Sequence, residues 1–198
     1  GPDPASIDSC MIGGIAANNA SGMCCGTGQN SYKTVENMKI VFSDGTILDT
    51  GDPNSRVLFK ERHAELIGEI EAIGREINGD VLLSQRIQEK YRIKNTMGYS
   101  LNAFADYSDP IDIICHLMIG SEGTLGFISE ITYRTVVDHA YKASALIIFP
   151  DIGTACTAVS MLKKEPVSAV ELMDRASLRS VENKEGMPDY LKSIGDDA

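Results

Sequence analysis

The sequence has 198 residues, 43% of them apolar, which is enough to bury a core and to form one domain and part of another. Lys and Arg total 18 against 28 Asp and Glu, and the formal charge of −10 disfavours nucleic acid and anionic lipid as partners. The apolar runs, such as residues 143–150, are far shorter than the roughly 20 residues that span a bilayer, so we expect no transmembrane segment.

The cysteines and the first residue give two further expectations. The cysteines show neither a CxxC pair nor a zinc spacing; they are Cys10, Cys24, Cys25, Cys115 and Cys156. We therefore expect reduced thiols in a cytoplasmic protein and no metal site. Gly1 is not an initiator Met, and we expect it to be a cut inside a longer protein or a tag remnant.

The first half of the chain predicts small residues, then a hairpin, then helices. Residues 1–30 show little helical periodicity and many glycines and alanines, which predicts an irregular segment that can approach another group closely. Asp-Gly at Asp44-Gly45, between two short apolar runs, predicts a β-hairpin over residues 38–49. Apolar spacing predicts one amphipathic helix from Ser55, its N-cap, to residue 77, and a second over residues 80–91.

The second half predicts the end of one unit and the start of another. Residues 110–118 predict a short buried helix, and the Gly-rich residues 120–126 interrupt regular structure. A strand is expected over residues 127–137, with one face formed by Phe127, Ser129, Ile131, Tyr133 and Thr135. Residues 143–149, 152–164 and 169–172 then predict strand, helix and strand. We place the boundary so that residues 1–138 and 139–198 form separate domains.

Two glycine-rich segments are the candidate functional motifs. GGIAANNASG occupies residues 13–22 and GSEGTLG occupies residues 120–126, and neither has the Rossmann or Walker spacing. A backbone without Cβ atoms can present N–H groups to a pyrophosphate or lie against a flat ring, even in an acidic protein. From spacing alone, the alternative that these glycines only form tight turns is equally supported.

The order of the motifs gives a more specific interpretation. PDPAS at residues 2–6, GGIAANNASG, CCGT at 24–27, SDGT at 43–46 and GSEGTLGFISE at 120–130 resemble the vanillyl-alcohol oxidase / p-cresol methylhydroxylase flavoprotein superfamily. Within it they are most similar to the D-lactate, glycolate and D-2-hydroxyglutarate dehydrogenase branch. The resemblance covers roughly residues 2–137 and implies an α+β fold: the second subdomain of a PCMH-type FAD-binding domain, followed by the start of an α+β substrate cap.

The resemblance also implies which residues bind the cofactor, FAD. Two stretches carry the family's motif. They comprise Pro4, Ala5, Ser6, Ile7, Gly13, Gly14, Asn18, Asn19, Ala20, Ser21 and Gly22, and then Glu122, Gly123, Thr124, Leu125, Gly126, Phe127 and Ile128. The first stretch is expected along the flavin or pyrophosphate, and the second along the adenine and ribose through backbone groups.

The loop KNTMGY at residues 94–99 resembles a KxNTGY-type stretch that lies near the flavin ring in the family, with Met97 as a departure. It implies Asn95, Thr96 and Tyr99 as substrate-pocket residues, whereas an ordinary surface loop remains the alternative. The pair Cys24-Cys25 is interpreted as buried packing, with a thiol near the flavin as the alternative.

The implied activity belongs to a longer protein. It is oxidation of a D-2-hydroxy acid by hydride transfer to FAD, with electrons passed to an acceptor, and the most similar members continue into a C-terminal iron–sulfur module. No catalytic residue is assigned here, because the family's base lies further into the cap, so the chain alone is expected to be inactive. The stretch that contains Glu171 resembles the start of that cap. The alternative is that Glu171 is a strand-end carboxylate on a solvated face. A flavin-independent binding module and an oxidase that uses oxygen remain the other hypotheses.

Overall fold

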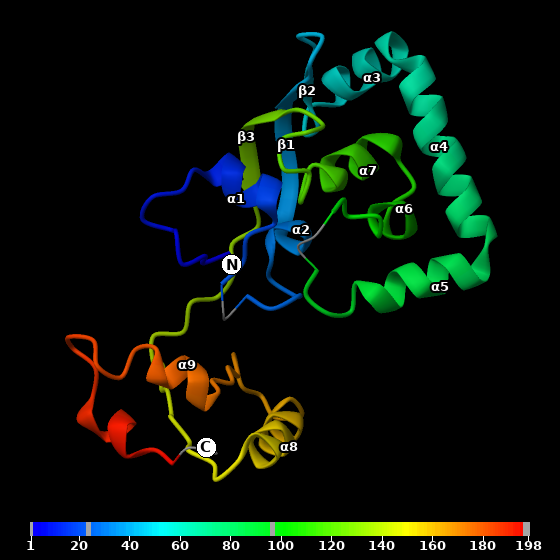
Figure 1. The fold of residues 1–198 in the computed structure, drawn as a ribbon. Helices are drawn as coiled ribbons and strands as arrows, with labels where there is room; N and C mark the ends of the chain where they lie inside the picture. The colour runs from blue at the N-terminus through cyan, green and yellow to red at the C-terminus, as the bar shows by residue number, and fades with distance from the viewer. Residues whose placement is uncertain (1, 23–24, 96–97, 196–198) are drawn as a thin grey trace. The chain divides into compact units, whose positions relative to one another are not determined.

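The computed structural model describes residues 2–22, 25–95 and 98–195. The chain divides into two compact units, Gly1–Val136 and Val137–Ala198, and each is described by itself. The first unit combines helices with a three-stranded antiparallel sheet of order β2-β1-β3 (Figure 1). This mixed content is consistent with the expected α+β class.

The predicted hairpin is confirmed. Strands β1 (Val35–Val41) and β2 (Ile47–Asp49) pair in antiparallel fashion. Gly45 lies at φ +81°, a conformation that suits glycine, and the Asp44 carboxylate accepts a 2.8 Å hydrogen bond from the Thr46 N–H. The short polar turn therefore closes the hairpin with its own side chain.

Strand β3 (Phe127–Tyr133) is confirmed, although it ends before residue 137, and Phe127 does not share the single side-chain face that was predicted for it. Lys39 pairs with Glu130 whereas Ile40 pairs with Ile128, so the ladder contains an irregularity at Ser129. Such a bulge reverses the alternation of side chains beyond it. Ile128 consequently points into the core, while Phe127, which was expected to share a face with Ile131 and Tyr133, is 68% exposed.

The expectation of an irregular N-terminal segment is wrong for α1 (Ile12–Asn18), which is a helix. Its buried residues Ile15 and Ala16 face the rest of the unit, and the helix packs against β3. The one-turn helix α2 (Ser31–Thr34) leads directly into β1. Periodicity was weak here because small residues bury little surface, and the contacts that form the helix come from distant segments.

Three helices form an arc around α6 (Ala103–Asp106) and α7 (Pro110–Leu117), as Figure 1 shows. They are α3 (Pro53–Arg62), α4 (Ala64–Gly79) and α5 (Val81–Lys90). The predicted helix over residues 80–91 is thus confirmed as α5, and the short buried helix over residues 110–118 is confirmed as α7.

The single helix predicted from Ser55 to residue 77 is wrong. Its chain bends at His63, whose φ of −114° and ψ of 40° are not helical and whose ring stacks on Phe59 with 4.4 Å between centroids. The N-cap of α3 is Asp52, which accepts from the Asn54 N–H. Ser55 instead accepts a hydrogen bond from the Asp49 N–H, and so ties the helix to β2.

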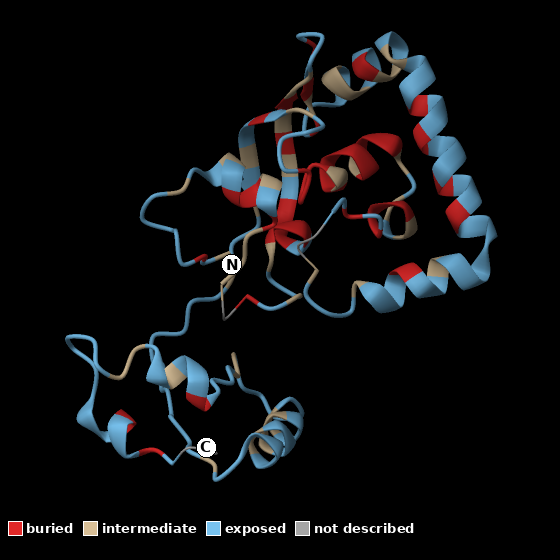
Figure 2. Ribbon diagram, viewed as in Figure 1, coloured by how far each residue is buried: buried red, intermediate tan, exposed pale blue. Residues whose placement is uncertain are grey.

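The core lies between the sheet and the helical arc (Figure 2). Met38 and Ile40 of β1 and Phe59 of α3 are almost fully buried, and α7 is buried along most of its length. On α4 the buried residues recur at helical spacing and include Ile67, which matches its amphipathic pattern.

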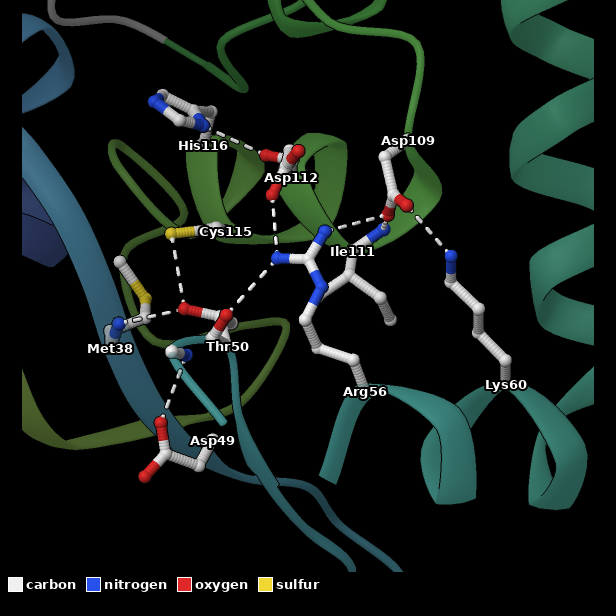
Figure 3. Close-up of polar contacts among 11 residues, drawn as sticks. Met38, Asp49, Thr50, Arg56, Lys60, Asp109, Ile111, Asp112, Cys115 and His116 are labelled. Atoms are coloured by element: carbon white, nitrogen blue, oxygen red, sulfur yellow. Dashed lines mark hydrogen bonds and ion pairs between the residues drawn. The ribbon is translucent and has the colours of Figure 1, made fainter. Parts of the chain in front are cut away.

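An ion-pair cluster fastens α3 to the start of α7 (Figure 3). The Arg56 guanidinium lies 2.7 Å from Asp112 and 3.0 Å from Asp109, and it also donates to the Thr50 carbonyl. Lys60 donates to the second oxygen of Asp109. Partial burial would raise the pKa of Asp109, but hydrogen bonds from Lys60 and from the Ile111 N–H, together with Arg56, leave that pKa lowered.

The second unit contains α8 (Ile152–Leu162), α9 (Arg175–Arg179) and a 3-10 helix (Asp189–Ser193). The predicted helix over residues 152–164 is therefore confirmed. The strands predicted over residues 143–149 and 169–172 are wrong, since neither segment pairs in a sheet within the described part of the chain. Residues 146–148 are more than half exposed, and an extended apolar run without a partner strand forms no ladder.

Candidate cofactor site

The two glycine-rich segments meet at the end of α1, although about a hundred residues separate them in sequence. Gly120 donates its backbone N–H to the carbonyl of Ala16 at 3.2 Å, and Glu122 donates to the carbonyl of Ala17 at 2.9 Å. The loop amides thus occupy carbonyls that the helix end leaves without intrahelical partners. The N–H groups of Gly120 and Glu122 bind the protein itself.

Side chains and backbone strain reinforce this junction. Asn18 donates to the Glu122 carboxylate at 2.7 Å. Asn19 and Glu122 are the described non-glycine residues with positive φ, at 51° and 53°. Such left-handed residues cost free energy unless their surroundings hold them in place, and they gather at functional sites. The junction is therefore a candidate site on structural grounds as well.

Beside the junction lies an open hollow of about 300 Å³ in the first unit. Six of the seven described residues that line it were assigned to FAD from the sequence. They are Pro4, Ala5, Ser6, Asn18, Ala20 and Ser21. The PAS segment and the end of the Gly-rich segment, expected along the flavin or pyrophosphate, are thus brought together at one place.

The seventh lining residue is Lys94, which the sequence analysis did not select. Its ammonium donates to the Ser21 carbonyl at 3.3 Å, and no carboxylate of the described residues pairs with it. Among the described residues that line the hollow, Lys94 is the one with a charged side chain. Two facts in the sequence could have pointed to it: it begins the KNTMGY stretch, and a cation suits an anionic cofactor in a protein of net charge −10.

Several other assigned residues lie away from the hollow or pack within the protein. A Cβ on Gly13 would come within 3.0 Å of the Ile128 carbonyl, and one on Gly126 within 3.2 Å of the Val41 carbonyl, so both glycines allow close packing on the sheet. A Cβ on Gly22 would overlap Asp3.

The remaining assigned residues do not line the hollow either. Ile128 is buried in the core. Phe127, Leu125 and Ile7 are 68%, 38% and 54% exposed. Gly14 and Gly123 have open space where a Cβ would lie.

The residues assigned to the substrate lie next to the junction. The Asn95 carbonyl accepts a 3.3 Å hydrogen bond from Asn19, and the Tyr99 hydroxyl lies 2.8 Å from the Thr124 hydroxyl. Thr96, with Met97, lies outside the described residues. The structure therefore links Asn95 and Tyr99 to the two segments assigned to the cofactor.

None of the described cysteine and histidine side chains lines the hollow. Cys25 is buried and its thiol donates to the carbonyls of Gly22 and Gly26, which fits the packing interpretation; Cys24 lies outside the described residues.

Glu171 is exposed on an irregular segment. Among the described residues, no three His, Cys, Asp or Glu side chains gather as a metal site, and no helix is long and apolar enough to cross a membrane.

Two sequence profiles match the chain. One, described as an FAD binding domain, matches residues 1–51, which include six of the residues around the hollow. The other, described as the C-terminal domain of FAD linked oxidases, matches residues 138–197. The chain belongs to the FAD-linked oxidases. FAD is the cofactor of these oxidoreductases, and the superfamily is that of the p-cresol methylhydroxylase type named above.

Similar proteins place this FAD-linked oxidase on the D-lactate dehydrogenase branch. It is 26% identical over 181 residues to D-lactate dehydrogenase (cytochrome) 1, mitochondrial, of Saccharomyces cerevisiae, covering 88% of this chain and 22% of that protein. It is 36% identical over 75 residues to D-lactate dehydrogenase (cytochrome), mitochondrial, of Arabidopsis thaliana, covering 37% of this chain and 13% of that protein. The chain therefore spans about a fifth or less of these relatives' length. No solved structure matches the chain.

Proposed function

We propose that this chain is part of an FAD-dependent dehydrogenase that oxidises a D-2-hydroxy acid resembling D-lactate. The observation that carries the proposal is the hollow beside α1, where six residues assigned to FAD by motif line one surface in a chain of the FAD-linked oxidases. The substrate class is supported by the names of the similar proteins, which are D-lactate dehydrogenases.

The hollow fits part of the cofactor. Its volume of about 300 Å³ is at the lower end of ligand pockets, which run from about 300 to 1,000 Å³, so a second wall is needed to enclose the whole of FAD. Ala5 and Ala20 are small enough to let a ring approach, and the hydroxyls of Ser6 and Ser21 offer hydrogen bonds. Lys94 supplies a positive charge for the cofactor's phosphates.

When bound, FAD supplies the chemistry by accepting a hydride from the substrate carbon that carries the hydroxyl. This chain's residues hold and orient the cofactor. Oxidation of the alcohol also needs a base that takes the hydroxyl proton, within hydrogen-bond reach of the substrate. The described lining of the hollow contains no His, Asp or Glu, so we assign no base within it.

The electron acceptor is also part of the proposal. The names of the similar D-lactate dehydrogenases include cytochrome, which suggests a one-electron protein acceptor rather than oxygen. Reduction of cytochrome c by the substrate-reduced protein, measured with and without oxygen, tests this. Faster reoxidation by oxygen than by cytochrome would favour an oxidase instead.

The experiment uses the full-length protein that contains this chain, purified with FAD. We expect flavin absorption bands, and dye reduction with D-lactate, glycolate or D-2-hydroxyglutarate but not with L-lactate. Ala20→Leu narrows the hollow and should lower flavin occupancy and dye reduction together. Ala72→Leu, on an exposed position of α4, is the matched control and should change neither.

Two results would contradict the proposal. A protein that binds no flavin at any concentration would contradict the cofactor assignment and favour the flavin-independent binding module. A flavin-loaded protein that is silent on every 2-hydroxy acid would retain the cofactor assignment and lose the substrate class.

A further inference from the structure

The Tyr99 side chain is not part of the described lining of the hollow and instead contacts the glycine-rich loop at residues 120–126. Its hydroxyl lies 2.8 Å from the Thr124 hydroxyl. The Thr124 hydroxyl in turn lies 2.6 Å from the Ser121 carbonyl, and two oxygens approach so closely only with the Thr124 hydrogen between them. A threonine hydroxyl has one hydrogen, so Tyr99 is the donor in its contact with Thr124.

The backbone on either side of the Tyr99 side chain is fixed by its neighbours. The Tyr91 hydroxyl, at the end of α5, donates to the Tyr99 carbonyl at 2.7 Å and accepts from the Leu101 N–H at 3.1 Å. Ser100, which is buried, donates its hydroxyl to the Ile119 carbonyl at 2.7 Å. Because these contacts come from two separate parts of the chain, the fold itself directs the Tyr99 side chain toward Thr124.

The turn that Tyr99 contacts has an unfavourable backbone conformation. The Thr124 N–H donates to the Ser121 carbonyl at 3.0 Å and closes a β-turn whose central residues, Glu122 and Gly123, have φ of 53° and 75°. Glycine adopts such a conformation readily, whereas glutamate does so at a cost in free energy. The turn therefore needs contacts that hold it, and the hydrogen bonds made by the Tyr99 and Thr124 hydroxyls supply them.

The turn supports the wall of the hollow through Glu122. The Glu122 N–H donates to the Ala17 carbonyl near the end of α1, and the Glu122 carboxylate accepts from the Asn18 amide at 2.7 Å. Asn18 is one of the residues that line the hollow. Relaxation of the turn at Glu122 would shift both contacts, and Asn18 would lose its support.

We propose that Tyr99 is a positioning residue of the cofactor site and not a substrate contact. By donating to Thr124 it holds the turn at residues 121–124, and through Glu122 it keeps Asn18 in the wall of the hollow. The carboxylate of a 2-hydroxy acid only accepts hydrogen bonds, so Tyr99 would have to break its bond to Thr124 in order to bind it. The inference rests on the proposed FAD site and revises the role that the family resemblance implies for Tyr99.

The first test compares FAD affinity and substrate use in the full-length protein. Tyr99→Phe removes the hydroxyl and keeps the ring. We expect the affinity of the flavin-free protein for FAD, measured by fluorescence titration, to fall about three- to tenfold, which is the net contribution of one hydrogen bond. At saturating FAD, the KM for D-lactate in dye reduction should equal that of the wild type, because no contact with the substrate is removed.

Tyr133→Phe is the matched control. The Tyr133 hydroxyl donates to the Ser31 hydroxyl at 3.0 Å in the same unit, and neither residue belongs to the described lining of the hollow. Like Tyr99→Phe, this variant loses one hydroxyl hydrogen bond and keeps its ring. It therefore accounts for a general loss of stability, and its FAD affinity should equal that of the wild type.

The second test asks whether Tyr99 acts through Thr124. Thr124→Val removes the hydroxyl but keeps the branched shape and the backbone, whereas Thr124→Ser keeps the hydroxyl. We expect Thr124→Val to lower FAD affinity at least as much as Tyr99→Phe does, and Thr124→Ser to bind FAD nearly as the wild type does. The double variant Tyr99→Phe/Thr124→Val should bind FAD as Thr124→Val does, because both substitutions break the same bond.

The inference and the proposed function fail in different ways. Unchanged FAD affinity in Tyr99→Phe, or a loss equal to that in Tyr133→Phe, would overturn the positioning role. A raised KM for D-lactate with unchanged FAD affinity would make Tyr99 a substrate contact. Additive losses in the double variant would show that Tyr99 does not act through Thr124. A wild-type protein that binds no flavin would overturn the proposed function, and this inference with it.

Discussion

Gly13 and Gly14 are neighbours in α1 but meet different surroundings. A Cβ on Gly13 would lie 3.0 Å from the backbone oxygen of Ile128, which cannot move without the strand, whereas a Cβ on Gly14 would meet nothing within 4 Å. Gly→Ala in a helix stabilises by up to about 0.5–1 kcal/mol. Overpacking costs about 1–3 kcal/mol. We therefore expect Gly14→Ala to stabilise the protein and Gly13→Ala to be neutral or destabilising.

The difference between the two variants isolates the contact with β3, because the helix contribution is nearly the same in both. That difference should be about 1–3 kcal/mol in favour of Gly14→Ala. Urea unfolding followed by far-UV circular dichroism measures it, since the chain contains no tryptophan. Equal stabilities of the two variants would refute the packing argument.

Flavin occupancy of the Gly14→Ala variant separates packing from binding at the same position. The family resemblance implies that Gly14 lies along FAD, while the structure shows open space there. Raised stability with lost flavin would indicate that the cofactor fills this space. Raised stability with unchanged flavin would indicate that the cofactor lies only over the hollow.

Three further predictions concern the ion-pair cluster, a buried histidine and the hollow. Arg56→Ala should lower the free energy of unfolding in urea by about 1.5–3 kcal/mol, because it breaks charge-assisted bonds to Asp109, Asp112 and the Thr50 carbonyl. The control Arg75→Ala removes an exposed ion pair with Glu71 and should change that free energy by no more than about 0.5 kcal/mol. Burial lowers the pKa of His116 below 6.5, so its neutral form is favoured in the folded state and the free energy of unfolding should fall as the pH drops below about 6.5. His116→Asn should lessen this loss of stability between pH 7 and 5. An unchanged pH profile of stability in this variant would contradict the prediction. Lys94→Met should weaken FAD binding roughly two- to fivefold, measured by fluorescence titration, and should leave riboflavin binding unaffected. Lys94→Arg should bind FAD nearly as the wild type does. Equal losses of affinity for FAD and riboflavin in Lys94→Met would rule out a role of Lys94 at the phosphates.

The elements that could be predicted are those whose signals are local. Asp44-Gly45 carries its own turn chemistry, and Asp80 caps α5 through a bond to Leu83 three residues away. The helix α7 follows from a dense apolar run behind Asp109, which caps it. Each of these depends on residues within one or two turns.

The elements that failed depend on distant partners. The helix α1 is held by β3 and by the loop at residues 120–122, about a hundred residues away. The bend at His63 has no Gly or Pro to announce it and is accompanied by the stacking of its ring on Phe59. The bulge at Ser129 appears only once β3 is paired with β1. Periodicity along one segment contains none of this information.

The candidate site was predictable as a set of residues but not as an arrangement. The motifs named most of the hollow's lining, yet they also included Gly126 and Ile128, which pack into the sheet and core. A motif records every residue that a fold and its site require together. Residues required by the fold can be separated from residues required by the site only in the structure. The structure is also needed to identify Lys94, whose place beside Ser21 is set by a loop far along the chain.

The structure also changes how an anion would be held in so acidic a chain. The sequence suggested that glycine-rich backbone N–H groups face the pyrophosphate, but the amides of Gly120 and Glu122 are directed to carbonyls at the end of α1. Those bonds offset the partial negative charge of the helix C-terminus next to the hollow, which would otherwise repel phosphate. With these amides occupied, the positive charge in the described lining comes from Lys94. The glycine-rich junction therefore shapes and neutralises the wall, and a side chain supplies the attraction.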